Sequence, residues 1–307
     1  MAEKLVAVVG PTAVGKTRVS IELAKAFDGE IINGDSMQVY RSMDIGTAKI
    51  TEKEAEGVPH HLFDIKDPTE SYSAAEFQET ARPLVTEINR RGHVPIVVGG
   101  TGMYIKSLTH HFNFSETDSD PDFREEMEKM ANSSNAGDLY ERLKAVDPVS
   151  AERVHPHNVR RVIRALEIYH VTGVPASKRR KQEEESPYQL ATVGLTMDRD
   201  LLYSRINKRV DQMIENGLIQ EVQHLYENGV RDCQSVQAIG YKEIYSYFQG
   251  ECTLEEAIEL LKRNSRRYAK KQYTWFRRQM DVRWFGMSLE ETGKKISAIK
   301  QFVAGTL

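Results

Sequence analysis

Short, largely apolar runs alternate with longer amphipathic segments in the first and last thirds of the chain. The runs cover residues 5–9, 30–32, 61–65, 94–98, 190–195 and 281–285, and each has the length of a strand. Segments between them, such as 18–27 and 73–90, place apolar residues every three or four positions, which is the spacing of a helix face. Strands that alternate with helices indicate an α/β protein with a parallel sheet.

Residues that favour helix ends predict several helix limits. Ser73 followed by Glu76 is the pattern of a capping box, so a helix is expected over 73–90. The remaining predictions are a single helix over 201–226, a tight turn over 238–242 before another helix, and a last long helix over 253–280.

The middle of the chain has a different composition. A polar linker covers 115–121, and residues 122–185 then show helical spacing without a convincing strand. The predicted helices are 123–130, 136–146 and 158–172, and the last ends at Gly173. A charge-rich segment over 178–185 precedes the strand at 190–195. We therefore expect a core domain from 1–114 and 187–307, with a helical insertion domain at 115–186.

The first strand and helix are joined by the phosphate-binding pattern G-x-x-x-x-G-K-[ST]. In such a loop, backbone N–H groups and the helix N-terminus face one point, a lysine adds a charge, and the final hydroxyl is a usual Mg²⁺ ligand. The pattern predicts binding of a group with two or more phosphates, but alone it does not say whether that group is a nucleotide. Its residues are Gly10, Pro11, Thr12, Ala13, Val14, Gly15, Lys16 and Thr17.

Two polar residues follow strands of the predicted sheet. Asp35 comes just after the strand at 30–32, and Thr101 follows the strand at 94–98. Ligands of parallel sheets bind at the carboxyl ends of strands, so both are expected near the phosphate loop. An Asx-turn or a helix cap is the alternative for Asp35. The strand at 94–98 ends in Gly-Gly-Thr, where many nucleotide hydrolases have an aspartate that helps to hold Mg²⁺. This difference argues against ordinary ATP hydrolysis.

Basic residues cluster locally on predicted helices. Arg205 and Arg209 are four residues apart, so they share a helix face that could reach a polyphosphate. A second group lies at 160–164, and the helix at 253–280 mixes many basic and aromatic residues, which suits phosphate contact and base stacking. For all three groups, ordinary solvated surface charge is the alternative.

Composition narrows the possible classes of protein. The chain has 307 residues, 40% of them hydrophobic, and a net charge of −3, which excludes a globally basic nucleic-acid binder but not a local basic face. Its two cysteines, Cys233 and Cys252, form no CxxC pair and predict neither a zinc module nor a disulfide framework. Adjacent His60 and His61 would point to opposite faces of a strand, which favours structural roles over shared metal binding. The N-terminus reads as a strand rather than a signal peptide, and we expect no membrane span.

Several separated stretches resemble one enzyme family, the bacterial tRNA dimethylallyltransferases, also called tRNA isopentenyltransferases. The matching stretches are 10–17, 34–40, 46–47, 59–62, 98–104, 158–161, 239–241 and 270–275. The resemblance implies a P-loop NTPase-like parallel sheet core with an inserted all-helical domain that folds over the RNA. It also implies transfer of dimethylallyl from its diphosphate to N6 of the adenine 3′-adjacent to the anticodon, in tRNAs reading codons that begin with U.

The same resemblance implies the cofactor and the partners. They are Mg²⁺, dimethylallyl diphosphate in the phosphate loop in place of ATP, and the anticodon stem-loop of tRNA. Apart from the resemblance, we expect a cytoplasmic protein, with both cysteines reduced, and a monomer. Eukaryotic relatives often add a C-terminal zinc finger, and this sequence contains none.

By resemblance, Asp35 matches the general base, Thr101 a catalytic-site threonine and Arg209 a diphosphate-binding arginine. From the loop pattern and the helix spacing, Lys16 and Arg205 are expected to hold diphosphate as well. Thr17 is the expected metal ligand. The positions that match tRNA contacts are Asp35, Ser36, Met37, Gln38, Thr101, Phe123, Val159, Arg160, Arg161, Val162, Ile163, Gln237, Gly240, Tyr241, Lys242, Lys270, Lys271, Gln272, Trp275 and Arg277.

Two other functions compete with this interpretation. A small-molecule P-loop kinase with a helical lid would turn over ATP without RNA. A P-loop RNA-binding switch would show nucleotide-dependent RNA affinity and form no product. The tRNA-related stretches favour the transferase over both.

Overall fold

The computed structural model describes residues 2–111, 120–133, 136–179, 185–288 and 290–307. The chain divides into two compact units, one formed by Met1–His110 and Glu185–Leu307 and the other by His111–Glu184. The sequence analysis placed these boundaries at 114/115 and 186/187. The predicted linkers at 115–121 and 178–185 lie mostly outside the described residues.

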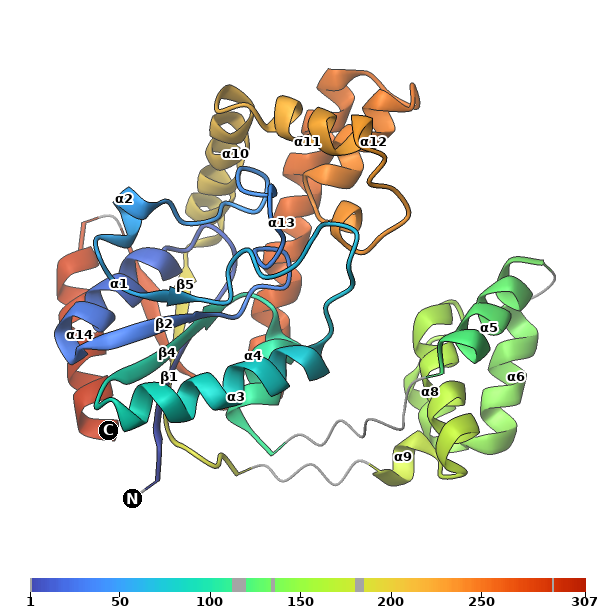
Figure 1. Ribbon diagram of the computed structural model, residues 1–307, viewed down its shortest axis with the longest axis horizontal. Coiled ribbons are helices and arrows are strands. Elements are labelled where there is room, and N and C mark those ends of the chain that lie inside the picture. The colour runs from blue at the N-terminus through green and yellow to red at the C-terminus, as the bar shows by residue number, and fades with distance from the viewer. Residues whose placement is uncertain (1, 112–119, 134–135, 180–184, 289) are drawn as a thin grey trace. The chain divides into compact units, whose positions relative to one another are not determined.

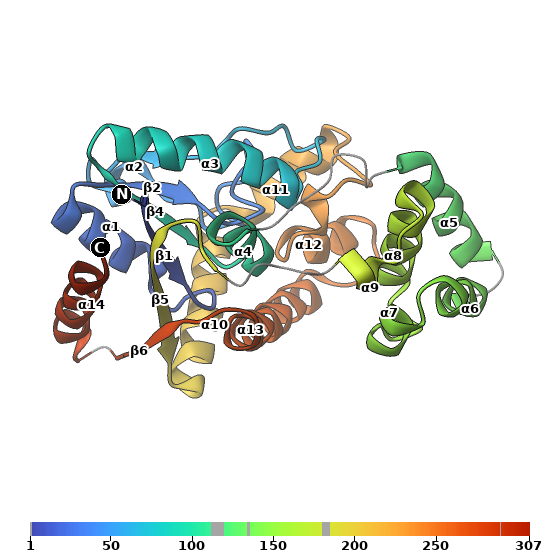
Figure 2. The same cartoon turned by 90° about the horizontal axis from the view of Figure 1, so that it is seen from below.

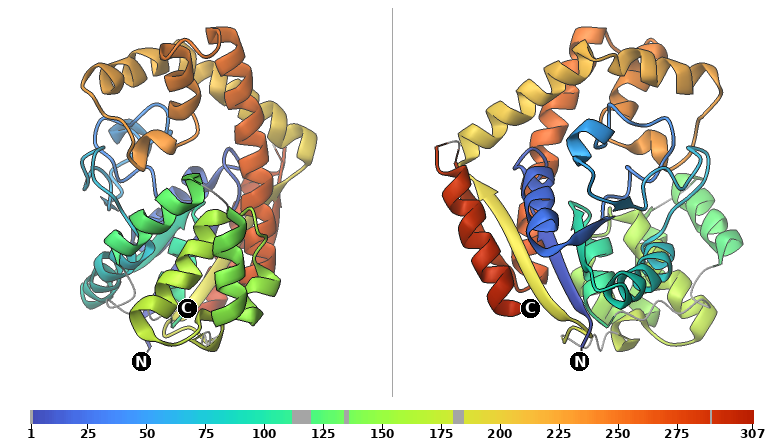
Figure 3. Two further views of the ribbon diagram at one scale, coloured as in Figure 1. Left: turned by 90° about the vertical axis from the view of Figure 1, so that its right-hand side faces the viewer. Right: turned by 60° about the vertical axis from the view of Figure 1, so that its left-hand side comes forward.

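The larger unit is built on a six-stranded parallel sheet (Figure 1) with the order β3-β2-β4-β1-β5-β6. The strand labels in Figure 2 follow this order from β2 to β6, and Figure 3 shows β5 (yellow) beside β1 (dark blue). The strands are β1 (Lys4–Val9), β2 (Gly29–Asn33), β3 (His60–His61), β4 (Val94–Gly99), β5 (Gln189–Met197) and β6 (Arg283–Met287).

Helices cover both faces of this sheet. Successive side chains of a strand point to opposite faces, and those of β1 are apolar on both, so each face needs a covering layer. Leu5, Ala7 and Val9 of β1 belong to one hydrophobic cluster with α3 (Ala74–Arg90), α4 (Gly102–Thr109) and α13 (Leu254–Gln279). Val6 and Val8 belong to a second cluster with α1 (Lys16–Phe27) and α14 (Thr292–Thr306). The predicted α/β core with a parallel sheet is therefore confirmed.

Several helices of this unit begin or end as their sequences predict. Ser73 and Glu76 form the expected capping box at the start of α3. Gly240 has a φ of 105°, which produces the expected turn before α12 (Tyr241–Phe248). Two short elements, α2 (Glu52–Ala55) and the 3₁₀ helix η2 (Ser235–Gln237), complete the unit.

The predicted single helix over 201–226 is wrong. Two helices cover this region, α10 (Arg199–Glu215) and α11 (Leu218–Glu227). Gly217 between them has a φ of 100°, a left-handed conformation that interrupts the α-helical backbone. The helix over 253–280 is also not the last, because α14 follows β6.

The predicted strand over 61–65 is also wrong beyond its first residue. β3 is limited to His60–His61, because Leu62 and Asp64 adopt positive φ values of 64° and 54° that cannot continue a strand. The last strand begins two positions later than predicted, as β6 at Arg283.

The described residues of the smaller unit form helices and the turns that join them, without a strand. Asn158 caps α8 by accepting a bond from the Arg161 N–H, and Gly173 ends that helix with a φ of 67°. Glu167 is a buried charged residue of this unit: its side chain has no exposed surface, and it forms ion pairs with Arg124 and Arg164. The helices of the smaller unit are α5 (Pro121–Ser133), α6 (Ala136–Val146), α7 (Pro148–Arg153), α8 (Val159–Thr172) and α9 (Ala176–Arg179).

No helix in the described part of the chain combines the length and apolar character needed to cross a membrane. Cys233 and Cys252 are both free thiols.

Candidate active site

The phosphate loop connects β1 to α1 and has the backbone geometry that its glycines predict. Gly10 and Gly15 have φ values of 146° and 106°. A Cβ at Gly10 would lie 2.7 Å from the carbonyl oxygen of Leu195 on the neighbouring strand β5. Glycine is therefore required at position 10 both by conformation and by space.

Lys16 lies folded against this loop. Its Nζ donates to the carbonyl oxygens of Gly10 (3.0 Å) and Pro11 (2.9 Å). Burial, opposed by the negative charge of Asp35 and assisted by the positive charge of Arg209, lowers the pKa of Lys16 to about 8. Lys16, Asp35 and Arg209 therefore lie within electrostatic reach of one another.

Two arginines of α10 contact the same loop, as their spacing predicted. Arg205 Nε donates to the Ala13 carbonyl oxygen at 2.9 Å, and Arg209 Nη1 donates to Thr12 Oγ1 at 3.3 Å. Within the described ranges, neither arginine forms an ion pair with a carboxylate. Burial and the charge of Arg205 lower the pKa of Arg209. This excess of positive charge favours binding of an anion.

Asp35 follows β2 and is held in a turn. The buried Asn33 side chain accepts a bond from the Asp35 N–H through Oδ1 (2.9 Å) and donates to the Leu62 carbonyl oxygen (3.0 Å). Asp35 Oδ1 in turn accepts from the Met37 N–H at 2.9 Å. The Asx-turn that the sequence left open is therefore present, and it holds a carboxylate that lies within electrostatic reach of Lys16 and Arg209.

Thr101 links the loop after β4 to the loop after β2. Its Oγ1 accepts a bond from the Ser36 N–H (3.0 Å) and donates to Ser36 Oγ (3.3 Å). β2, β4 and β1 are neighbours in the sheet, so the segments that follow them meet at one edge. The structure thus brings together Asp35, Thr101 and the phosphate loop.

Helix α13 faces this edge with a row of side chains. Gln272 is 5% exposed, and its Oε1 accepts from the Thr12 N–H (3.0 Å) while its Nε2 donates to the Gly100 carbonyl oxygen (3.1 Å). Tyr268, one turn earlier, lies close to the side chains of Thr101 and Gln272, and burial and the charge of Asp35 raise its pKa.

Tyr268 was not among the predicted site residues. The 268, 272 and 276 spacing on one helix face, together with the small residues at 99–102, is the signal that could have identified it.

The other predicted RNA-contact residues of α13 divide into inward and outward groups. Trp275 packs on Gly102, where a Cβ would lie 2.1 Å from the indole ring. Lys270 and Lys271 are exposed, and Arg277 is exposed with its guanidinium 4.3 Å from the centre of the Tyr273 ring.

Tyr241 is fully buried, although its motif predicted an RNA contact. Its hydroxyl donates to Glu221 Oε1 at 2.6 Å, and its ring occupies the space beside Gly46. Gln237 and Lys242, on either side of the Gly240 turn, are exposed.

The helical unit shows a similar division. Val162 and Ile163 are buried in its hydrophobic core, whereas Arg160 and Arg161 are exposed and Val159 is half-buried. Phe123 stacks on His170, with ring centres 4.2 Å apart and an angle of 10° between the planes.

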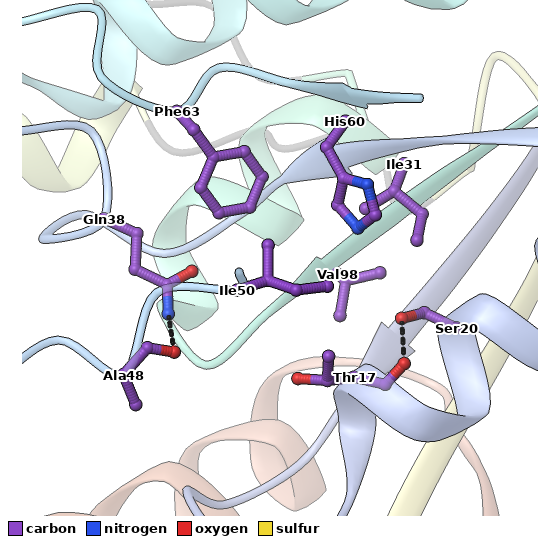
Figure 4. A pocket seen from close by; sticks show the side chains of 9 residues that line it. All are labelled: Thr17, Ser20, Ile31, Gln38, Ala48, Ile50, His60, Phe63 and Val98. Atoms are coloured by element: carbon purple, nitrogen blue, oxygen red, sulfur yellow. Dashed lines mark hydrogen bonds between the residues drawn. The ribbon is translucent and has the colours of Figure 1, made fainter. Parts of the chain in front are cut away.

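Gln38, at the end of the segment 36–38, lines a pocket that also includes Thr17 of the phosphate loop (Figure 4). Met37 packs against the hydrophobic cluster under α13, and Gln38 Nε2 donates to the carbonyl oxygens of Thr47 (2.9 Å) and Ala48 (3.2 Å). The pocket has a mixed polar and apolar wall formed by Thr17, Ser20, Ile31, Gln38, Ala48, Ile50, His60, Phe63 and Val98.

The histidines and the metal-ligand candidates can be placed as well. His60 Nδ1 bonds with the Val58 carbonyl oxygen and His61 Nε2 with Glu30, so each has a structural partner. Across the described residues, no three histidine, cysteine, aspartate or glutamate side chains form a metal cluster. Thr17 is exposed beside the loop, which fits an ion held mainly by substrate phosphates and water.

Residues 38–279 match the sequence model described as IPP transferase. The chain is 59% identical over 309 residues to the tRNA dimethylallyltransferase of Halalkalibacterium halodurans, and the match covers 100% of this chain and 98% of that protein. It is 57% identical to that of Anoxybacillus flavithermus, covering 99% and 97%.

Solved structures agree with these sequence matches. The full-length tRNA isopentenylpyrophosphate transferase of Bacillus halodurans superposes with a TM-score of 0.75 at 57% identity, covering 99% of this chain and 96% of that one. A eukaryotic dimethylallyltransferase acting on tRNA gives a TM-score of 0.84 at 32% identity, covering 97% and 77%.

Proposed function

Since the chain belongs to the IPP transferase family, we propose that it transfers the dimethylallyl group of dimethylallyl diphosphate to N6 of a tRNA adenine and releases diphosphate. The target is the adenine 3′-adjacent to the anticodon in tRNAs reading codons that begin with U. The observation that carries the proposal is the meeting of a carboxylate, a hydroxyl and a cationic phosphate loop at one sheet edge. The kinase alternative is not retained, because the full-length relatives are named tRNA dimethylallyltransferases.

The leaving group is the first chemical requirement. An allylic diphosphate departs through a cation-like transition state, so negative charge develops on the diphosphate oxygens. Loop amides, Lys16, Arg205 and Arg209 surround the position where these oxygens would lie. Because they are already in place before substrate arrives, they stabilise that charge with little reorganisation.

Mg²⁺ would be held by the Thr17 hydroxyl together with diphosphate oxygens and water. When bound, the ion neutralises charge on the departing diphosphate. Thr17 is the second residue of α1, so its hydroxyl lies beside the loop amides that would hold the same phosphates.

The nucleophile is the second requirement. Adenine N6 is a poor nucleophile and must lose a proton, which needs a base within hydrogen-bond reach. Asp35 fits this role because its Asx-turn holds it within electrostatic reach of Lys16, on the loop that would hold the electrophile. Thr101 lies beside it and would orient the amine. The target adenine is stacked in the folded anticodon loop, so it must first be turned out of that stack to reach Asp35 and Thr101.

RNA contact would fall to exposed cationic residues. Lys270, Lys271 and Arg277 on α13 and Arg160 and Arg161 on α8 are exposed. Phosphates of an anticodon stem-loop suit such side chains, since they add affinity without reading sequence. We expect the protein to act as a monomer in the cytoplasm.

The decisive experiment is mass spectrometry of nucleosides from tRNA that has been incubated with the protein, dimethylallyl diphosphate and Mg²⁺. The expected result is an adenosine that is heavier by one dimethylallyl group, and mass spectrometry of nuclease fragments of the same tRNA should locate it next to the anticodon. Unmodified tRNA under conditions where the protein is folded would refute the proposal.

A further inference from the structure

We infer that Gln272 is a positioning residue that sets the separation between the phosphate loop and the loop carrying Thr101. The inference rests on the proposed function, because these two loops would hold the two reacting partners. It assigns to Gln272 a role inside the protein, in place of the tRNA contact that its motif suggested.

The contacts of Gln272 form a bridge between two segments that are far apart in sequence. At one end, Oε1 accepts from the Thr12 N–H at 3.0 Å, and Thr12 Oγ1 also accepts from Arg209. At the other end, Nε2 donates to the Gly100 carbonyl oxygen at 3.1 Å, one residue before Thr101. A single planar amide therefore spans the gap between the diphosphate side and the adenine side.

The surrounding residues leave this amide little freedom. A Cβ at Gly100 would lie 2.0 Å from Gln272 Nε2, and one at Gly102 would lie 2.1 Å from the Trp275 ring. Helix α13 thus approaches the loop after β4 closely at two successive points. Tyr268 of the same helix also lies close to the side chains of Thr101 and Gln272.

The geometry also separates Gln272 from its neighbours on the helix surface. Gln272 is 5% exposed and both ends of its amide are bonded within the core unit, whereas Lys270 and Lys271 are exposed. RNA can reach the two lysines without displacing any of these bonds. The bridge should therefore affect the chemical step and leave tRNA affinity nearly unchanged.

The first test compares Gln272→Met with Gln279→Met in the full-length protein. Methionine keeps the length and volume of glutamine but makes neither hydrogen bond, and Gln279 is exposed at the end of the same helix. With saturating dimethylallyl diphosphate and tRNA, Gln272→Met should lower the single-turnover rate about 100-fold, the effect of a misplacement near 1 Å. Its Kd for tRNA should stay within about twofold of wild type, and Gln279→Met should match wild type in both.

A second variant separates positioning from a general loss of packing. In Gln272→Glu the carboxylate can accept from the Thr12 N–H but cannot donate to the Gly100 carbonyl oxygen until it is protonated. The rate of this variant relative to wild type should therefore rise as the pH falls through the pKa of the new carboxyl group, which burial raises. The same ratio for Gln272→Met should not change with pH.

Hydrogen exchange supplies a readout that needs no activity. The Thr12 amide should exchange at least about tenfold faster in Gln272→Met, because its acceptor is removed. If wild type forms no product, the proposed function fails, and this exchange rate decides the inference on its own. A saturated rate equal to wild type, or a weakened tRNA Kd that accounts for the whole loss of activity, would overturn the positioning role.

Discussion

Glu221 holds a loop beside the site, and its removal provides a quantitative test of the packing described above. Its two carboxylate oxygens accept from the N–H groups of Asp44 (2.8 Å), Ile45 (2.8 Å) and Gly46 (3.0 Å), and from the Tyr241 hydroxyl (2.6 Å). Four donors from two segments thus converge on one side chain. We expect Glu221→Ala to destabilise the core unit and to release residues 44–46.

The size of this effect follows from the kind of bond that is lost. A hydrogen bond to a charged acceptor contributes about 1.5–3 kcal/mol. Water can replace the acceptor at the partly exposed N–H groups, whereas the Tyr241 hydroxyl is left in a buried site. The expected loss is therefore about 2–4 kcal/mol in the free energy of unfolding, below the sum of four full bonds. Tyr241→Phe removes one donor to this carboxylate and should cost about 1.5 kcal/mol, at the low end of the range, because Glu221 keeps its three backbone donors.

Urea denaturation of the single and double variants provides the assay. Because Glu221 and Tyr241 are in contact, the double variant should be more stable than the sum of the single losses predicts, by about 1 kcal/mol. Glu227→Ala is the matched control, since Glu227 lies on the same helix and is exposed, with a bond to Gln223; it should cost less than about 0.5 kcal/mol. A loss for Glu221→Ala no larger than that of the control would show that the loop does not depend on this carboxylate.

Three further predictions concern the chemistry and the RNA. Asp35→Asn should lower kcat by roughly 10²–10⁴ with little change in tRNA affinity, because it keeps shape but removes the base; a near-normal single-turnover rate would contradict the assignment. Since the pKa of Lys16 is about 8, the amine loses its positive charge as pH rises past 8, so calorimetry should show inorganic diphosphate binding weaken there in wild type but not in Lys16→Ala. Constant affinity from pH 7 to 9.5 would refute this. Replacing Lys270 and Lys271 with glutamine should flatten the slope of log K against log salt by about two units, and an unchanged slope would leave that helix face without phosphate contacts.

Local signals in the sequence were sufficient for much of the fold. The capping box at Ser73 and the helix end at Gly173 depend only on neighbouring residues, and both helices have these limits in the structure. The phosphate loop, Asp35 and Thr101 each follow a strand, and the carboxyl ends of parallel strands lie at one edge of a sheet. Their proximity could therefore be predicted from the sequence.

Tertiary packing decided the features that the sequence analysis missed. Gly217 inside a strongly periodic segment can be tolerated in a helix or can end one, and only its positive φ shows which occurs. Tyr241 and Gln272 lie in motifs typical of RNA contact, yet their partners Glu221 and Thr12 are 20 and 260 residues away in sequence. No local pattern reports such pairings, so the partners of these two side chains could not be predicted.

The position of the helical unit in the chain has a consequence for the order of synthesis. β1 pairs with β5 along its whole length, from Lys4 opposite Gln189 to Val9 opposite Gly194, and the helical unit lies between the two in sequence. At 5–20 residues per second, the ribosome needs roughly 10–40 s to reach β5 after β1 has been made. During that interval the apolar edge of β1 is open, while the helical unit, which has its own hydrophobic core, is completed first. A nascent chain that stalls before residue 189 would therefore combine a helical unit able to form its own core with an unpaired sheet edge that is prone to association.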